Sequence, residues 1–218
     1  MTFRRMGMAS GIVVAAMTVM AALAWHRLPP GTRLPTHWNA AGEVDGQADA
    51  VVALILPVGL MIALSLLLVV LPRIELMQRG KARSATLLTT AWAGLLAIMA
   101  LIEMVIAGPS LGVRLPPTLP LAAVGVLLMV VGNALPKSRP GFFIGIRTPW
   151  TMTDENNWIA THRLGARIFI AGGALIVLTA LLSLPVPVRS ALFIAAMVIA
   201  TVPPVVHSFL FWHRRAGG

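Results

Sequence analysis

The sequence contains no cysteine among its 218 residues. It therefore has no disulfide bond, no thiolate metal site and no cysteine nucleophile, and cysteine usage says nothing about its redox compartment. It also lacks the HExxH, GxSxG and P-loop motifs that mark zinc proteases, serine hydrolases and phosphate-binding loops. These absences argue against an enzyme, and the sequence predicts neither a cofactor nor a bound metal.

Charge is scarce as well. Only 11% of the residues are charged, 58% are hydrophobic and the mean hydropathy is +0.87. This composition excludes a soluble globular domain and indicates an integral membrane protein. The net charge of +10 could suggest a nucleic-acid partner. Because the basic residues lie in clusters between apolar runs, we interpret them as topology determinants and expect the partner to be the lipid bilayer, with no direct nucleic-acid binding.

The N-terminus has the form of a signal peptide, with Arg4 and Arg5 before an apolar run. The uncharged stretch from Met6 to Trp25 is longer than a usual signal-peptide core and has no A-x-A-like cleavage site at its end. We therefore predict a retained first span.

Six apolar windows are long enough to cross a bilayer, since roughly 20 residues at ~1.5 Å of rise cover ~30 Å of hydrocarbon. Backbone groups in lipid must be satisfied within each segment, so every window is predicted to be helical. The fold expected is all-α, a polytopic membrane helix bundle with six transmembrane helices. The windows are about Gly7 to Trp25, Val51 to Leu71, Ser84 to Ala107, Thr118 to Leu135, Ile168 to Leu184 and Ala191 to Trp212.

The distribution of basic residues predicts the orientation. With a cytoplasmic N-terminus, thirteen of the 17 Lys and Arg residues lie inside, and the other four are Arg27, Arg33, Arg114 and Arg189. This asymmetry indicates an N-in, C-in arrangement.

The first outer loop, Leu28 to Ala50, is rich in Pro, Gly, Asn and Asp, which favour turns. One interpretation is an ordered cap on the membrane surface, with Trp38 as an interfacial anchor. The alternative is a ligand or metal site that uses His37, Glu43 and Asp45.

Two features inside the apolar windows stand out. A charged Glu103 side chain in the third span costs free energy unless it faces the bundle interior, finds a partner or is protonated. Because Gly108 and Pro109 follow closely, the alternative places Glu103 about one turn from the outer interface. In the sixth window, the pair Pro203 and Pro204 is predicted to kink or interrupt the helix near His207.

The longest segment that is not plainly hydrophobic is the central loop, 133–167, predicted to be cytoplasmic. Its GFFIGIRTPW stretch is expected to be strand-like or re-entrant, and a helix is expected to begin near Asp154 and to run into the fifth span. On that helix four residues share one face, Trp158, Thr161, His162 and Gly165. This face suits packing at the lipid headgroups or docking of a partner.

Two motifs resemble known families. The run GNALPKSRPGFFIGIRTPWTMTDENNWIATHR resembles the SdpI family, bacterial membrane proteins named for the immunity protein of the sporulation-delaying toxin system. Upstream, LPTHWNAAGEVDG is similar to the P-x-HWN-x-x-G-x-x-DG motif of a domain of unknown function, DUF1648. The resemblance divides the chain into a DUF1648-like region, 1–72, and an SdpI-like region, 73–218.

The resemblance implies an immunity and signal-transduction protein of the bacterial cytoplasmic membrane that protects against a secreted toxic peptide. It further implies a cytoplasmic transcriptional repressor as a partner. On this view the outer loop faces the toxin through His37, Trp38, Asn39, Glu43 and Asp45. The matching cytoplasmic residues, expected to form or support a docking surface, are Asn133, Lys137, Arg147, Thr148, Pro149, Trp150, Trp158, Thr161, His162 and Arg163.

Two other hypotheses stay open. The first is a small membrane enzyme or transporter with a His and acid site, built from His37 with Glu43 or Asp45 outside, or from His162 with Asp154 and Glu155 inside. The second is a structural partner subunit without activity of its own.

Overall fold

The computed structural model describes residues 3–70, 78–141 and 144–216. Its long helices are α1 (Phe3–Trp25), α2 (Ala50–Val70), α3 (Gln78–Ala107), α4 (Leu119–Ala134), α6 (Glu155–Leu181) and α7 (Val186–Ala216). Within the described residues, 6 helices are long and apolar enough to cross a membrane. The predicted all-α bundle of six spanning helices is therefore confirmed.

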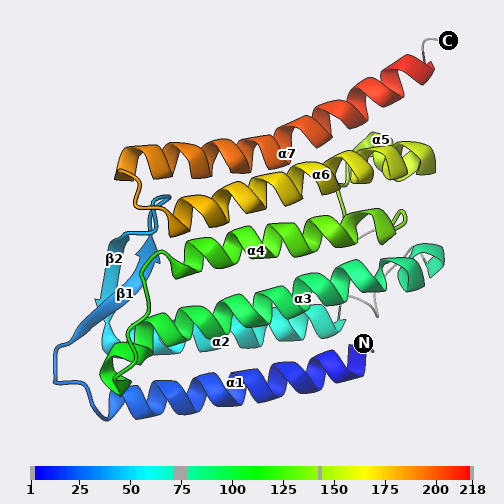
Figure 1. The fold of residues 1–218 in the computed structure, drawn as a ribbon. Coiled ribbons are helices and arrows are strands. Elements are labelled where there is room, and N and C mark those ends of the chain that lie inside the picture. The colour runs from blue at the N-terminus through cyan, green and yellow to red at the C-terminus, as the bar shows by residue number, and fades with distance from the viewer. Residues whose placement is uncertain (1–2, 71–77, 142–143, 217–218) are drawn as a thin grey trace.

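The helices run side by side, with both chain termini at one end of the bundle (Figure 1). We call this the terminal end. The other end carries a two-stranded antiparallel sheet of β1 (Arg33–Trp38) and β2 (Val44–Asp49), and we call it the hairpin end. Three short helical elements complete the described chain, η2 (Gly108–Leu111), η3 (Leu135–Lys137) and α5 (Pro149–Thr153).

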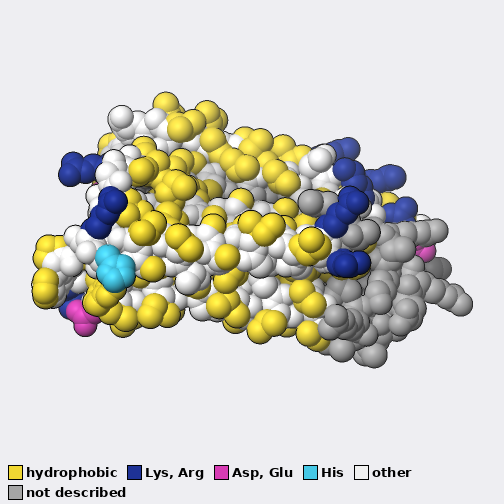
Figure 2. Space-filling model, turned by 90° about the horizontal axis from the view of Figure 1, so that it is seen from below, with side chains coloured by type: hydrophobic (Ala, Val, Ile, Leu, Met, Phe, Trp, Pro, Cys, Tyr) yellow, Lys and Arg dark blue, Asp and Glu magenta, His cyan; other side chains and the backbone are white. Residues whose placement is uncertain are grey.

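Apolar side chains cover the outside of the bundle as well as its interior. Ile12, Leu66 and Leu181 are among many large hydrophobic residues that are exposed in the isolated chain. Yellow side chains are spread along the flank between the two ends in Figure 2. An outward apolar surface of this extent fits lipid tails around the helices. The interior holds separate apolar clusters, one of which packs α1, α2 and α3 around Met61 and Trp92.

The second half of the bundle depends on close approach of α4 and α6. A Cβ atom added at Gly125 of α4 would lie 2.6 Å from the carbonyl oxygen of Gly173 on α6. One added at Gly132 would lie 2.8 Å from the Cβ of Phe169. Small residues let helix backbones meet in a membrane, where packing rather than water exclusion holds helices together. This contact sets the beginning of α6 beside η3.

The helix bounds differ from the expected windows mainly in the last two spans. Helix α6 begins at Glu155 rather than near Ile168, in agreement with the helix predicted to begin near Asp154 and to enter the fifth span. Helix α7 begins at Val186 and continues through Pro203 and Pro204 to Ala216. The prolines therefore do not interrupt α7, although it changes direction along its length (Figure 1).

Two expectations concern segments at or next to residues that lie outside the described ranges. The boundary proposed between residues 72 and 73 lies outside the described residues. In the GFFIGIRTPW stretch, the described residues from 144 onward form bends and the start of α5, not a strand. The strand-like interpretation is wrong for this part, because Thr148 caps a helix there instead.

Candidate functional site

The hairpin end brings His37 and Asp45 together across β1 and β2. The strands pair in antiparallel register, and the register shifts on both sides of His37. The Nδ1 atom of His37 lies 2.5 Å from Oδ1 of Asp45, and both side chains are largely open to solvent. Gly46 lies opposite His37, where an added Cβ would meet the His37 Cβ at 2.9 Å. The motif glycine therefore makes room for the histidine.

The turn between the strands is organised by Asn39. Its side-chain oxygen accepts hydrogen bonds from the N–H groups of Ala41 (2.9 Å) and Glu43 (3.0 Å). Gly42 has a φ of 78°, a left-handed conformation that glycine adopts without strain. Asn39 and Gly42 thus shape the turn that connects the exposed His37 and Asp45.

Glu43 is exposed and makes no contact with the His37 and Asp45 pair among the interactions of the described residues. No group of three or more His, Cys, Asp or Glu residues able to hold a metal is present in residues 3–70, 78–141 and 144–216. The structure therefore joins two of the three residues proposed for a metal or ligand site.

Trp38 attaches the hairpin to the helices. It packs with a buried cluster that contains Leu54 and Ile106, so it anchors the hairpin to the helices. It also borders two hollows, one of about 320 Å³ beside Leu121 and Phe193 and one of about 260 Å³ beside α2 and α3. Its indole N–H is buried and has no hydrogen-bond partner among the described residues.

Glu103 is fully buried in α3. Neither of its carboxylate oxygens has a hydrogen-bond partner among the described residues. The prediction that Glu103 faces the bundle interior agrees with this burial, and α3 ends one turn later at Ala107, so Glu103 also lies one turn from the end of its helix.

At the terminal end, Trp158 and His162 stack inside the protein. Their ring centroids are 4.1 Å apart at an interplanar angle of 17°, and both residues are 0% exposed. The His162 Nδ1 lies 2.8 Å from the Trp158 carbonyl oxygen, and its Nε2 lies 3.0 Å from the Ile146 N. Since a carbonyl can only accept and a backbone N–H can only donate, this geometry requires the neutral imidazole with its proton on Nδ1.

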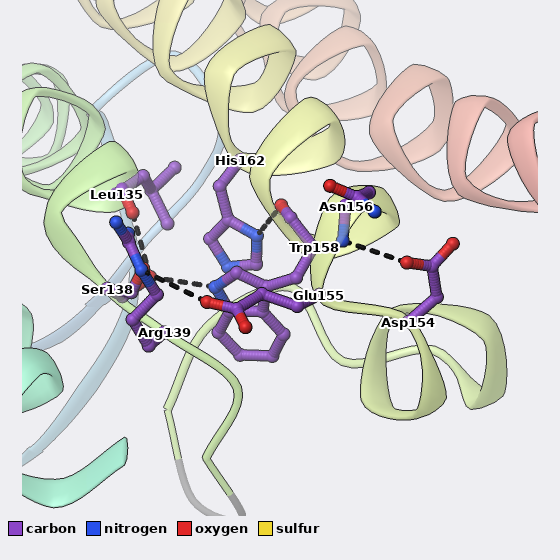
Figure 3. Close-up of polar contacts among 8 residues, drawn as sticks. All are labelled: Leu135, Ser138, Arg139, Asp154, Glu155, Asn156, Trp158 and His162. Atoms are coloured by element: carbon purple, nitrogen blue, oxygen red, sulfur yellow. Dashed lines mark hydrogen bonds and ion pairs between the residues drawn. The ribbon is translucent and has the colours of Figure 1, made fainter. Parts of the chain in front are cut away.

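The Trp158 indole is bound at its other end. Its Nε1–H donates to the Ser138 hydroxyl at 3.3 Å, and that hydroxyl donates to the Leu135 carbonyl at 2.8 Å (Figure 3). The stack therefore links α6 to η3 and to the segment before α5. Both ring systems have their polar atoms satisfied, as buried polar groups require.

Gly145 lies directly against this stack. Its φ is 118°, and an added Cβ would lie 2.6 Å from Trp158 Cη2 and 2.7 Å from His162 Nε2. No L side chain fits there on either ground. Gly145, the second glycine of the GFFIGIRTPW stretch, is therefore required because Trp158 and His162 pack directly against it.

A second buried network connects α5, α6 and α7. Thr148 caps α5, and its hydroxyl lies 3.0 Å from the hydroxyl of Ser208 on α7. The Asn157 amide donates to the Ser208 carbonyl (2.9 Å), and Thr161 donates to Asn157 Oδ1 (3.0 Å). The motif threonines are thus parts of a polar link through the bundle.

Ser138, Asn157 and Ser208 were missed in the sequence analysis. Asn157 precedes Trp158 and lies one turn before Thr161, so helical spacing places it beside the predicted polar face. Ser208 had no signal, because its partners lie far away in the sequence.

The motif residues divide by burial. Asn133, Lys137, Arg147, Pro149 and Arg163 are exposed and Trp150 is half-buried, whereas Thr148, Trp158, Thr161 and His162 are buried. The predicted shared face of α6 is confirmed by the burial of Trp158, Thr161, His162 and Gly165. An exposed surface of cation, indole and imidazole is not formed, because the polar atoms of both rings bind the interior. Trp158 and His162 support a surface rather than form one.

Two acids of this end form ion pairs with arginines. Asp154 Oδ2 lies 3.2 Å from Arg215, and Glu155 Oε1 lies 3.4 Å from Arg139 (Figure 3 shows the latter pair). Asp154 also caps α6, accepting from the Asn156 N–H at 2.8 Å. Asp154 and Glu155 are therefore engaged, and no described contact joins either to His162. Basic side chains gather mainly at the terminal end in Figure 2.

These features define a class, a polytopic membrane protein with a hairpin cap at one end and a buried aromatic and polar link at the other. Residues 137–208 match the SdpI/YfhL protein family and residues 12–62 match the domain of unknown function DUF1648. Both matches agree with the resemblance carried by the two motifs, the SdpI-like one in the C-terminal part and the DUF1648-like one before it.

A curated relative is similar to part of the chain. The immunity protein SdpI of Bacillus subtilis (strain 168) is 34% identical over 53 residues, which are 24% of this chain and 26% of the relative. The match thus spans about a quarter of the length of that relative. No solved structure matches the chain.

Proposed function

We propose that this chain is a non-enzymatic immunity protein of the bacterial cytoplasmic membrane that protects the cell against a secreted toxic peptide. The observation that carries the proposal is the similarity to the immunity protein SdpI together with the family match over residues 137–208. The six apolar helices support a multi-pass protein of this kind.

The hairpin end is the proposed toxin-facing part. With the N-terminus in the cytoplasm, β1 and β2 are outside the cell, and His37 and Asp45 are exposed there as a hydrogen-bonded pair. The hollows beside Trp38 are lined mainly by apolar side chains, including Leu121 and Phe193. A polar pair next to apolar hollows suits an amphipathic peptide.

The terminal end is the proposed signalling part. Arg147 and Arg163 are exposed on elements held by the Trp158 and His162 stack. Under this proposal the buried residues hold the exposed arginines in place, and a cytoplasmic transcriptional repressor binds the exposed ones.

The alternative is a small membrane enzyme or transporter with a His and acid site. The specific observation that favours it is the close pair of His37 and Asp45, since a histidine oriented by a carboxylate is a common acid-base arrangement. The corresponding inside site is weaker, because both nitrogens of His162 are bound to backbone groups.

The test is a toxin challenge of a sensitive bacterial strain that expresses the full chain. We expect protection, and we expect His37→Ala or Asp45→Ala to reduce it at least tenfold in surviving cells at equal membrane level. Asp49→Asn is the matched control, since Asp49 is an exposed acid of the same hairpin outside the pair. Absence of protection by the wild-type chain, or equal loss in the control, would refute the proposal.

A further inference from the structure

A groove between α6 and α7 opens on the flank of the bundle. It has a volume of about 310 Å³ and is lined by Arg167, Ile168, Ala171, Gly172, Leu175, Ala196 and Ile199. Small residues form the floor of the groove. Gly172 has no side chain there, and the Ala196 carbonyl of α7 lies close to it. The lining from Arg167 to Leu175 runs about 12 Å along α6 at ~1.5 Å per residue. This is the direction in which acyl chains lie beside a spanning helix.

Arg167 lies at the end of the groove nearer the terminal end, and Arg163 follows one helical turn closer to that end. Both are exposed, and neither forms an ion pair or hydrogen bond with any described residue. The described acids of the terminal end are already engaged, Asp154 by Arg215 and Glu155 by Arg139. The described residues therefore supply no counter-charge for the two arginines, and both guanidinium groups are accessible to an anion from outside.

Arg167 also lies within the part of α6 that is long and apolar enough to cross a membrane. It is roughly 21 Å along the helix axis from Leu181 at the other end of α6, at ~1.5 Å per residue, and the hydrocarbon core is ~30 Å thick. An arginine near the end of a span extends its guanidinium toward the interface, where phosphate oxygens accept two hydrogen bonds from its planar fork. Arg163, one helical turn further toward the terminal end, adds a second guanidinium group that can donate hydrogen bonds to the same phosphate.

We propose that this groove is a binding site for an anionic phospholipid, with an acyl chain along Ala171 and Gly172 and the phosphate between Arg163 and Arg167. The site shares Arg163 with the proposed repressor surface, but the inference concerns lipid binding by the chain itself and does not depend on the immunity function. The combination of apolar floor and unpaired cations fits an acidic lipid better than a soluble anion, which would leave the groove empty.

The test uses the purified full chain in detergent, titrated with phosphatidylglycerol or phosphatidylcholine and followed by native mass spectrometry and thermal unfolding. We expect phosphatidylglycerol to be retained and to raise the melting temperature, and phosphatidylcholine to do so at least tenfold less effectively. Equal effects of the two lipids on the wild-type chain would overturn the proposal. The same stabilisation by inorganic phosphate alone would also overturn it, because the site would then be a simple anion site.

Variants separate the headgroup from the groove. The double change Arg163→Gln and Arg167→Gln should weaken phosphatidylglycerol binding roughly thirtyfold, since each basic residue near an anionic lipid contributes about a fivefold factor. The control is Arg214→Gln, because Arg214 is an exposed cation of the same end that lies outside the groove. It should lower the phosphatidylglycerol affinity much less than the double variant does. Equal losses would indicate nonspecific attraction and would contradict the site.

The groove is tested by Ala171→Phe, which fills it from an exposed position without altering a charge. We expect about a tenfold loss of phosphatidylglycerol affinity with unchanged insertion. Unchanged affinity would show that the acyl chain does not use the groove and would overturn the assignment. If the double arginine variant does not insert, the wild-type lipid comparison and Ala171→Phe decide the question.

Discussion

The Nε2 atom of His162 accepts a hydrogen bond from the backbone N–H of Ile146, at 3.0 Å. This bond ties the first turns of the long helix α6 to the segment that precedes α5. It leaves the imidazole with no free nitrogen, because Nδ1 is bound to the Trp158 carbonyl. A histidine held in this way serves as a structural connector. The exposed residues on either side of it are the ones left to contact partners.

Gly145→Ala should destabilise the terminal end. The residue would have to adopt a φ of 118° and would place its Cβ within 2.7 Å of His162 Nε2. We expect a loss of about 2–4 kcal/mol in the free energy of unfolding, from backbone strain of about 1 kcal/mol together with overpacking of about 1–3 kcal/mol. Thermal unfolding of the purified chain measures it.

The control for this change is Gly112→Ala. Gly112 has a comparable positive φ of 86°, but nothing lies within 4 Å of an added Cβ. It should therefore show the backbone strain alone. Equal destabilisation by the two variants would mean that the stack of Trp158 and His162 is not closely packed against Gly145.

Asn157→Leu should weaken the link between α6 and α7. The change keeps the side-chain volume similar but removes the donor to the Ser208 carbonyl and the acceptor of the Thr161 hydroxyl. Buried groups left without partners cost about 1–3 kcal/mol each. The matched control is Asn156→Leu, at the exposed position directly before Asn157, and it should change the unfolding temperature little. A similar small effect of both variants would contradict the proposed link.

Glu103→Gln and Glu103→Lys should differ in their effect on folding. Glu103 is fully buried with both oxygens unpartnered among the described residues. The amide removes the charge at nearly constant volume, whereas lysine buries a longer side chain of opposite sign. We expect near wild-type membrane levels and thermal stability for the glutamine variant and a marked loss for the lysine variant. Equal behaviour of the pair would contradict burial in the assembled protein.

The N-in, C-in orientation can be tested by labelling, because the chain has no native cysteine. Gln47→Cys at the hairpin end and Lys137→Cys at the terminal end are both exposed positions. An impermeant thiol reagent added to intact cells should label the first and should label the second only after permeabilisation. Reversed labelling would place the hairpin in the cytoplasm.

Local patterns in the sequence were enough to predict the six spans, the start of α6 near Asp154 and the common face of Trp158, Thr161, His162 and Gly165. Hydropathy over about 20 residues, helix capping and the helical period each depend on neighbours in the chain. The two family motifs could likewise be found from contiguous residues.

Only the tertiary structure decided where that face points. The same spacing suits lipid, a partner or the protein interior, and the interior was selected because Ser138, Ile146 and Leu135 approach it from other segments. The pairing of His37 with Asp45 required the irregular register of the hairpin. The bonds of Asn157 to Ser208 and the burial of Glu103 depend on helices far apart in sequence, since a polar group in a membrane bundle takes its partner from whichever element packs against it.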